Sequence, residues 1–446
     1  YTAIDNVLFN KTGTILIQYP IGNTETTYKI LANVTIIGYN AFNGATSLET
    51  VTFEAGSQLD SIGHYAFQSA TALTSINIPE GVKSIGTSAF YGATSLTSIT
   101  IPASVTSIEV GAFSRGGLTD ITVESSNTYY TAIDNVLFNK TGTILIQYPV
   151  GNDATSYEIP SSVTIIGNHA FSASSLTSIT IPEGVTSIVA NAFAGATKLE
   201  SITIPANVES IGSNAFQNAT SLATVTFEAS SQLKSIGIRA FKNVTSLTSI
   251  TIPEKVTTIG ESAFEDATSL ETVTFEAGSQ LDSIGNYAFA GASSLTSVII
   301  PSGVSIGTNA FPIVDAGDDT EVDGIASVPI CFPAGTPVTT DQGFVPIEKL
   351  HPDKHTIDGE KIIAITQTRP LFKKIVLIKK NALAKNIPFQ DTEISNHHMV
   401  SYQGNMIQAG ELVKLCKGVE FIRYNGETLY NVLLNKHSVM TINNMV

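Results

Sequence analysis

Apolar residues recur with a period close to 23 residues along the first two-thirds of this 446-residue chain. The clearest marker is an Ala-Phe pair, whose spacing is 22 to 25 residues apart from a single gap of 58. A period of this length is too short for two-helix repeats and is typical of one strand plus a turn or short helix per unit. The pattern therefore predicts a β-rich solenoid over residues 1–313. The pairs end at Phe42, Phe67, Phe90, Phe113, Phe171, Phe193, Phe216, Phe241, Phe264, Phe289 and Phe311.

One unit shows what each repeat has to bury. Between Leu247 and Pro253, apolar residues alternate with Thr and Ser, and the proline cannot donate to a strand ladder. We predict a short strand here, with Ile250 and Ile252 facing inward and their hydroxyl-bearing neighbours facing outward. No unit can cover its apolar side alone, so each Leu and each Phe (Phe264 in this unit) is expected to lie over its counterpart in the next coil.

Two variations interrupt the repeat. Some units are two residues longer because a segment such as 52–59 (Thr-Phe-Glu-Ala-Gly-Ser-Gln-Leu) replaces the shorter Ile-Pro-Glu-Gly-Val turn, and we expect these insertions along one edge. The 58-residue gap contains residues 130–149, which are identical to residues 1–20. This segment predicts a wider hairpin coil, and its recurrence after 129 residues indicates duplication of a larger block.

These residues resemble the BspA-type leucine-rich repeat family, over about residues 24–313. The resemblance implies a curved, right-handed solenoid with a strand-lined face, at the cell surface or in adhesion. Family members often carry a cysteine shortly after Ala-Phe, whereas this chain usually has Ala there, as at Ala45, Ala93 and Ala267. The ligand, a protein or a glycan, does not follow from the resemblance. Hydroxyls on the outward face are either a recognition surface, including one for ice or a polysaccharide, or simply residues that favour a soluble strand.

Charge and composition limit the partners of the solenoid. Residues 331–446 hold 13 Lys+Arg and 10 Asp+Glu, a net of +3, so the whole-chain −15 leaves −18 for residues 1–330. That acidity argues against nucleic acid as a partner. No apolar run is long enough for a membrane helix. Residue 1 is Tyr, so we expect the native start to lie upstream. His64 and His169, in the turns before Ala-Phe, are predicted to be solvated.

Residues 314–330 are small, acidic and without periodicity, which predicts a linker. Its run from Asp319 to Gly324 is similar to a calcium loop, but Ile330 stands where the bidentate Glu belongs. Zinc binding by Cys331, Cys416 and the histidines would need short regular spacings that are absent. We therefore predict neither a metal nor a cofactor.

The regular repeat is absent from Cys331 onward, where short apolar runs are irregularly spaced. Residues 331–446 therefore predict a compact all-β unit with strands near 361–367, 374–379, 399–402 and 430–434. A thiolate at Cys331 lies one residue after the carbonyl of Ile330, which it could attack to turn the amide into a thioester. That step needs a proton donor and a supporting hydroxyl. The segment from Ser395 to His398 supplies both, with His397 as a rival for His398.

A second resemblance rests on these residues. The opening run Cys-Phe-Pro-Ala-Gly-Thr-Pro-Val, residues 341–350, Ser395-x-x-His398 and the block from Leu429 to His437 resemble a Hint domain, the fold of hedgehog autoprocessing domains and inteins. The resemblance implies Cys331 as nucleophile, His398 acting on the scissile amide and Ser395 as its support. Candidates whose roles the resemblance leaves open are His397, Asn431, where many members carry Asp, and His437.

The carboxyl end departs from inteins, because Val446 stops where they place a terminal His-Asn pair. The resemblance therefore predicts single-turnover scission between Ile330 and Cys331, with the thioester resolved by water or a small nucleophile, rather than splicing. The whole chain is then a surface or secreted binding solenoid that cleaves itself. The alternative is a purely structural leucine-rich-repeat adhesin or interaction protein with an inactive Hint-like domain.

Overall fold

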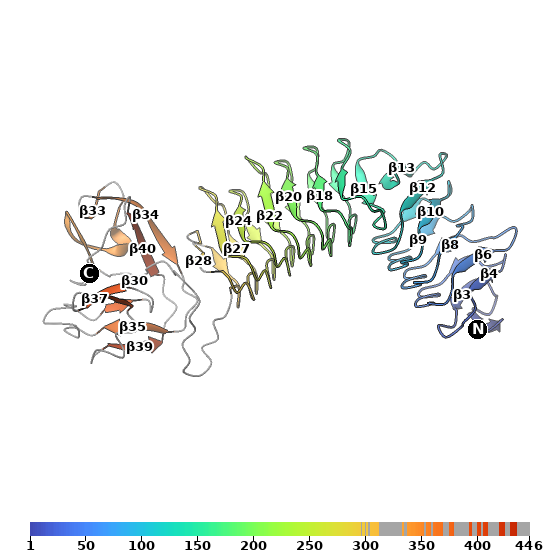
Figure 1. The fold of residues 1–446 in the computed structure, drawn as a ribbon, viewed down its shortest axis with the longest axis horizontal. Helices are drawn as coiled ribbons and strands as arrows, with labels where there is room; N and C mark the ends of the chain where they lie inside the picture. Colours follow the sequence, from blue (N-terminus) through green and yellow to red (C-terminus); the bar gives the residue numbers. More distant parts are fainter. Residues whose placement is uncertain are drawn as a thin grey trace.

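The computed structural model describes the solenoid almost continuously and, after it, mainly strands. Within residues 1–311 as described, the secondary structure consists of short strands and turns, and Figure 1 shows the coils stacked into an arch. The described residues are 1–295, 297–298, 300–301, 304–311, 332–333, 337–351, 354–357, 360–368, 374–378, 392–394, 399–402, 405–408, 419–423 and 429–434.

Each coil contributes a two-residue Ser-Ile or similar strand to one face of the solenoid. Consecutive coils pair these strands in parallel, as Ser210–Ile211 does with Ser235–Ile236, which fixes a one-strand step per coil. Two separate sheets result, each beginning with an antiparallel hairpin. The first is β1 (Thr2–Ile4), β2 (Val7–Phe9), β3 (Ile15–Gln18), β5 (Ile36–Ile37), β7 (Ser61–Ile62), β9 (Ser84–Ile85) and β11 (Ser107–Ile108); the second is β13 (Tyr130–Ile133), β14 (Val136–Asn139), β15 (Ile144–Gln147), β17 (Ile165–Ile166), β19 (Ser187–Ile188), β21 (Ser210–Ile211), β23 (Ser235–Ile236), β25 (Thr258–Ile259), β27 (Ser283–Ile284) and β29 (Ser305–Ile306).

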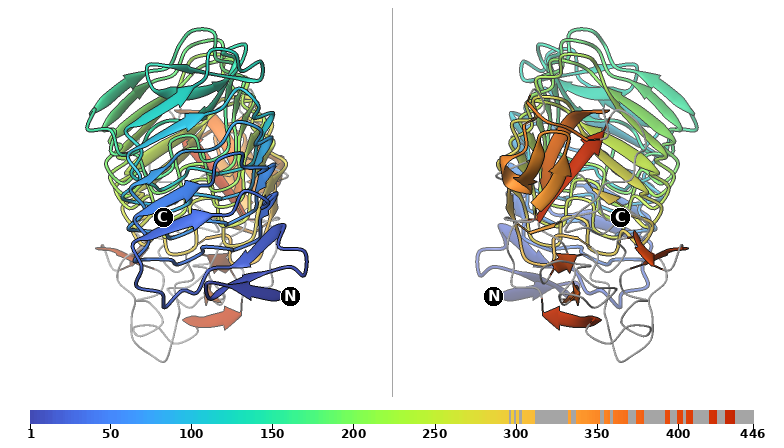
Figure 2. Two further views of the ribbon diagram at one scale, coloured as in Figure 1. Left: turned by 90° about the vertical axis from the view of Figure 1, so that its right-hand side faces the viewer. Right: turned by 90° about the vertical axis from the view of Figure 1, so that its left-hand side faces the viewer.

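The longer strands form a second face, which we call the hydroxyl face. Their burial alternates as predicted, so in β24 Ile250 and Ile252 are buried while Ser249 and Thr251 are exposed. The hydroxyl face comprises β4 (Thr27–Ile30), β6 (Thr50–Phe53), β8 (Ser75–Ile76), β10 (Ser98–Ile101), β12 (Asp120–Val123), β16 (Ser156–Glu158), β18 (Ser178–Thr180), β20 (Ser201–Ile204), β22 (Thr224–Phe227), β24 (Ser249–Ile252), β26 (Thr272–Phe275) and β28 (Ser297–Val298). The end-on views of Figure 2 show its strands superposed along the solenoid axis.

The core between the faces is a column of stacked phenylalanines, which confirms the predicted register. Ring centroids of Phe193 and Phe216 lie 5.0 Å apart at an interplanar angle of 2°, and the other neighbouring pairs are similar. Parallel coils hold equivalent side chains about 4.8 Å apart, close to the offset-stacking distance of aromatic rings. Each column starts with a tyrosine, Tyr19 in the first and Tyr148 in the second.

The segment around each Ala-Phe pair is a turn and not a short helix. Two positions per coil, two residues before and two after the Phe, have positive φ, as at Arg239 (54°) and Asn243 (59°) around Phe241. A left-handed residue every four positions is incompatible with an α-helix. The chain instead bonds to the next coil, for example from the Phe67 amide to the Ala89 carbonyl at 2.7 Å.

The longer units lie at one edge, as predicted, and their glutamates have a structural task. The Glu54 carboxylate accepts a hydrogen bond from the Ala32 amide (2.9 Å), and Glu228 does the same for Ala206 (3.1 Å). Each insertion therefore satisfies an amide in the turn of the preceding coil, which has no strand partner there.

The solenoid consists of two blocks that meet at the second hairpin. Residues 7–121 form one buried core and residues 136–311 form another, and the break in the sheets falls between β11 and β13. The hairpin of β13 and β14 is the wider coil that the sequence predicts. One hairpin residue, Leu137, belongs to the core of the first block. The first coil of the second block therefore covers the end of the first core.

After the solenoid, the described residues are mainly strands, and four of these lie at the predicted positions. The prediction of strands near 361–367, 374–379, 399–402 and 430–434 is confirmed, whereas the fold of a Hint domain is not established by these strands. They are β30 (Phe332–Pro333), β31 (Pro337–Thr340), β32 (Gly343–Pro346), β33 (Thr356–Ile357), β34 (Glu360–Thr368), β35 (Lys374–Ile378), β36 (Thr392–Ile394), β37 (Met399–Tyr402), β38 (Asn405–Gln408), β39 (Val419–Arg423) and β40 (Leu429–Leu434), with one 3-10 helix at Ile347–Lys349.

Candidate functional site

The hydroxyl face presents Thr and Ser side chains in rows that cross the strands. Two pairs of threonines on neighbouring strands bond to each other: Thr100 with Thr122 (2.8 Å) and Thr251 with Thr274 (2.9 Å). These bonds orient the hydroxyls, and the side chains remain exposed. The face therefore offers a regular, pre-oriented set of hydrogen-bonding groups to a polar ligand.

The face is hollowed in the first block. A hollow of about 440 Å³ lies over β6 and β8, where Thr52, Glu54, Asn77 and Glu80 line it. A smaller one of about 220 Å³ shares Thr52 and Asn77 and extends to Thr100 on β10. Together we call them the block-one hollow. Sequence reasoning described the face but missed the hollow.

The block-one hollow has a local cause in the repeat lengths. The long insertion after Phe53 stands beside the shorter turn at Pro79 and Glu80, so the two loops project unequally. The strand between them, β8, has only two residues, and the sheet is interrupted between β8 and β10. A shallow, mostly open depression lined by hydroxyl, amide and carboxylate groups follows.

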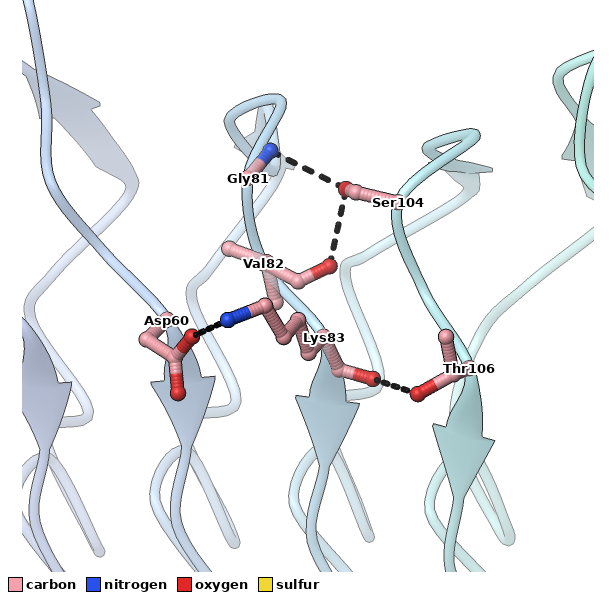
Figure 3. A network of polar contacts seen from close by, with 6 residues as sticks. All are labelled: Asp60, Gly81, Val82, Lys83, Ser104 and Thr106. Carbon is pink, nitrogen blue, oxygen red and sulfur yellow. Dashed lines mark hydrogen bonds and ion pairs between the residues drawn. The ribbon is translucent and has the colours of Figure 1, made fainter.

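Polar contacts on the turns outside the hydroxyl face are structural. Lys83 Nζ lies 2.7 Å from Asp60 Oδ1 on the previous coil, and Ser104 Oγ accepts from the Gly81 amide (3.0 Å) while donating to the Val82 carbonyl (2.8 Å) (Figure 3). Both charged side chains are mostly exposed, so the ion pair adds little stability. These bonds connect neighbouring coils.

One carboxylate pair stands out electrostatically. A hydrogen bond with the Glu228 carboxyl raises the pKa of Glu183, helped by partial desolvation and by the negative charge of Glu228. In the part of the chain that the structure describes, no group of three or more His, Cys, Asp or Glu side chains is placed to hold a metal.

His169 lies where the end of the first block meets the start of the second block, a contact that we call the joint. His64 is exposed, as predicted, and accepts a hydrogen bond from the Thr87 amide (2.9 Å). The prediction of a solvated turn is wrong for His169, which is partly buried, with its Nδ1 enclosed and without a hydrogen bond. A Cβ built on Gly111 of the first block would lie 3.2 Å from its ring. The repeat pattern does not predict the burial of His169, because the residues that enclose it come from the other block.

We expect the stability of the joint to fall in acid because of His169. Burial, and then the positive charge of Arg115, lower its pKa below the ordinary value of about 6.5. His169 therefore binds a proton more readily in the unfolded chain than in the folded one. The folded state keeps its full stability above about pH 6.5 and loses part of it as the pH falls below that value.

Urea unfolding of wild type and His169→Asn at about pH 7.5 and about pH 5 measures this difference. Asn is the matched replacement, because Asn40 occupies the same place in the first block with a similar positive φ. Wild type should lose more stability than the variant between the two values. Equal losses in both proteins would contradict the assignment.

Most of the predicted processing residues lie outside the described part of the chain. Asn431 is on β40, paired with Thr366 of β34. Phe332, which follows Cys331 in the sequence, pairs with Tyr430, which precedes Asn431. The remaining candidates are outside the described residues: Ile330, Cys331, Ser395, His397, His398 and His437.

Parallel coils of two short strands around a column of Leu and Phe define a leucine-rich-repeat solenoid. The chain belongs to the BspA type leucine rich repeat family, whose model matches in six copies over residues 22–144, 151–232 and 226–313. Proteins of this family are typically secreted or exposed at the cell surface. In the residues described, no helix is long and apolar enough to cross a membrane.

One solved structure agrees with this assignment, and two others are similar in sequence over comparable lengths. A leucine-rich repeat protein from Eubacterium ventriosum is 32% identical with a TM-score of 0.60, over 67% of this chain and 80% of that one. Another from Bacteroides ovatus is 26% identical with a TM-score of 0.40, over 69% and 79%. A leucine rich cell surface protein from Faecalibacterium prausnitzii is 28% identical with a TM-score of 0.34, over 68% and 82%. A search of curated proteins found no match.

Proposed function

We propose that the protein is an adhesion or interaction module, outside the cell or on its surface, that binds a protein or glycan ligand at the block-one hollow. The hollow itself carries this proposal, because it is a concave departure from the regular hydroxyl face and its groups suit a polar ligand. Thr52 and Asn77 lie at its centre, since they line both of its parts. Membership of the BspA-type family supports an interaction role in preference to an enzymatic one.

Binding to an array of defined glycans and to a panel of purified extracellular matrix proteins tests the proposal. We expect the double variant Thr52→Lys and Asn77→Lys to weaken whatever binding the wild type shows by about tenfold or more, since a loss of about 1.4 kcal/mol suffices. The matched control is Thr203→Lys with Thr226→Lys, on exposed positions of the same face in the second block. Equal loss in the control, or no loss in the hollow variant, would reject this site.

A second proposed activity is self-cleavage between Ile330 and Cys331. The Cys331 thiolate attacks the Ile330 carbonyl, the C–N bond breaks, and the leaving amine takes a proton from His398, with Ser395 as support. Water then hydrolyses the thioester and restores the thiol. The resemblance of residues 331–446 to Hint domains is what motivates this proposal. The family match ends at residue 313 and favours the binding role alone.

Intact mass of freshly purified protein, with and without dithiothreitol, tests self-cleavage. We expect fragments that meet at Ile330 and Cys331 in the wild type, more of them with thiol, and none in Cys331→Ala. Cys416→Ala is the control, because it removes the other cysteine and should leave cleavage unchanged. A single uncut species in every sample would make residues 331–446 a structural appendage of the solenoid.

A further inference from the structure

Two parallel rows of polar side chains cross the block-one hollow. Each row takes one residue from each of three successive coils, and a buried apolar residue separates the rows within a coil, as Ile99 does on β10. The first row is Thr50, Ser75 and Ser98, and the second row is Thr52, Asn77 and Thr100. Five of these side chains are exposed and one is half-buried. The hollow therefore offers hydrogen-bonding groups along two lines, not at a single point.

The stacking of the coils sets the spacing within each row. Phe42, Phe67 and Phe90 precede β6, β8 and β10, and their ring centroids lie 4.8 Å and 5.2 Å apart along the column. Thr50 and Ser75 are direct partners in the parallel register, so a row advances by one residue per coil. Residues two apart in a strand are separated by about 6.6 Å, which sets the distance between the rows.

This spacing distinguishes between two kinds of linear ligand. An extended peptide advances about 3.3 Å per residue, and about 6.6 Å between residues that face the same way, so it loses register with the coils. One sugar of an extended β-1,4-linked chain advances by nearly the same distance as one coil. Such a chain is a flat ribbon with hydroxyl groups along both edges. The two rows can therefore bond both edges of the ribbon, with one sugar over each coil.

The charge of the hollow limits the kind of sugar chain. Glu54 and Glu80 line it, and neither of its two parts is lined by a lysine or an arginine. The Glu54 carboxylate is already bonded to the Ala32 amide, and Glu80 is exposed. This negative field repels sulfated and uronic-acid chains, and the net charge of residues 1–330 has the same sign. An uncharged chain pays no such penalty.

The shape of the hollow suits a polymer better than a small molecule. A small ligand is held by a cavity that encloses most of its surface, whereas this depression is shallow and mostly open. Phe53, which is half-buried, and Pro79 line its larger part and give apolar surface beside the polar rows. The C–H groups of a sugar ring can pack there. A long chain can bind such a site through several weak contacts and continue beyond it.

We propose that the ligand of the block-one hollow is an uncharged, extended β-1,4-linked polysaccharide that lies along the solenoid axis, with one sugar over each of β6, β8 and β10. The first row bonds one edge of the chain and the second row bonds the other. This inference rests on the proposed function and narrows its ligand to one class. Chains of glucose and of N-acetylglucosamine share this backbone geometry, and the experiment separates them.

Calorimetric titration of the full chain with sugar oligomers of defined length tests the inference. Cellohexaose and chitohexaose represent the two kinds of β-1,4-linked chain. Maltohexaose is the matched ligand control, because it has the composition of cellohexaose but its α-1,4 links coil the chain. We expect at least one β-1,4-linked oligomer to bind about tenfold or more tightly than maltohexaose. Its affinity should rise with length up to about three sugars, one per coil of the hollow, and then level off.

Ser98→Ala tests whether the chain lies on the rows. Removing this hydroxyl should weaken binding of the β-1,4-linked oligomer about fivefold, the usual effect of losing one hydrogen bond. Ser201→Ala is the matched control, because β20 has the same Ser-Ile-Thr-Ile sequence and burial pattern as β10 but lies in the second block. Its binding should be unchanged. Equal losses in the two variants, or tighter binding of maltohexaose, would overturn the inference.

The double variant Thr52→Lys and Asn77→Lys separates failure of this inference from failure of the proposed function. If it loses binding to a matrix protein while neither β-1,4-linked oligomer binds the wild type, the hollow remains a binding site and the polysaccharide is wrong. If the variant binds the oligomer as tightly as the wild type does, the chain does not lie in the hollow. A wild type that binds none of the glycans or proteins would overturn both.

Discussion

Phe216→Ala is expected to lower the free energy of unfolding of the second block by about 3–5 kcal/mol, as large-to-small changes in close-packed cores do. Phe216 is fully buried, and its ring centroid lies 5.0 Å from those of both Phe193 and Phe241. Its amide also bonds the Ala240 carbonyl of the next coil at 2.7 Å, which limits how far the backbone can move into the vacated space. A cavity in the middle of the column should therefore remain.

Chemical denaturation followed by circular dichroism measures this loss. Because each coil contacts only its neighbours, the loss should be largest in the second block and should reach the first block only through the contact between the two cores. Tyr287→Ala is the control, since that side chain is exposed and outside the column. A change below about 1 kcal/mol for Phe216→Ala would mean that the column relaxes around the gap.

The sequence was sufficient to predict those parts of the architecture that depend on a pattern present in every coil. Alternation at Ile250 and Ile252 was enough to place the buried side of a strand, and the recurrence of Ala-Phe was enough to predict the stacked column. The turn at Ala-Phe was left open between a turn and a short helix. Positive φ at a position such as Arg239 is hard to foresee, because the signal for it is normally Gly or Asn.

Features that depend on neighbouring coils were outside the reach of the sequence. The block-one hollow arises where loops of unequal length stand side by side, which no single repeat reveals. The environment of His169 depends on Gly111 and Arg115, more than 50 residues earlier in the chain. For the candidate processing site, sequence resemblance remains the whole argument for Cys331 and His398.

Gly151→Ala is expected to destabilise the joint between the blocks by about 1–3 kcal/mol, the usual range for overpacking a tight contact. The added Cβ would lie 2.6 Å from the Gly117 carbonyl carbon, and backbone on both sides of the joint leaves little freedom to move away. It would also strain the bond from the Gly151 amide to the Leu118 carbonyl. The first block should lose the cover that Leu137 gives its core.

The measurement is thermal unfolding by calorimetry, where one transition in the wild type should separate into two as the blocks lose their coupling. Gly22→Ala is a matched control, because it makes the same change at the equivalent position in an identical hairpin coil, where a Cβ meets open space. It should leave the profile unchanged. If both variants behaved alike, the approach of Gly151 to Gly117 would not be what couples the two blocks.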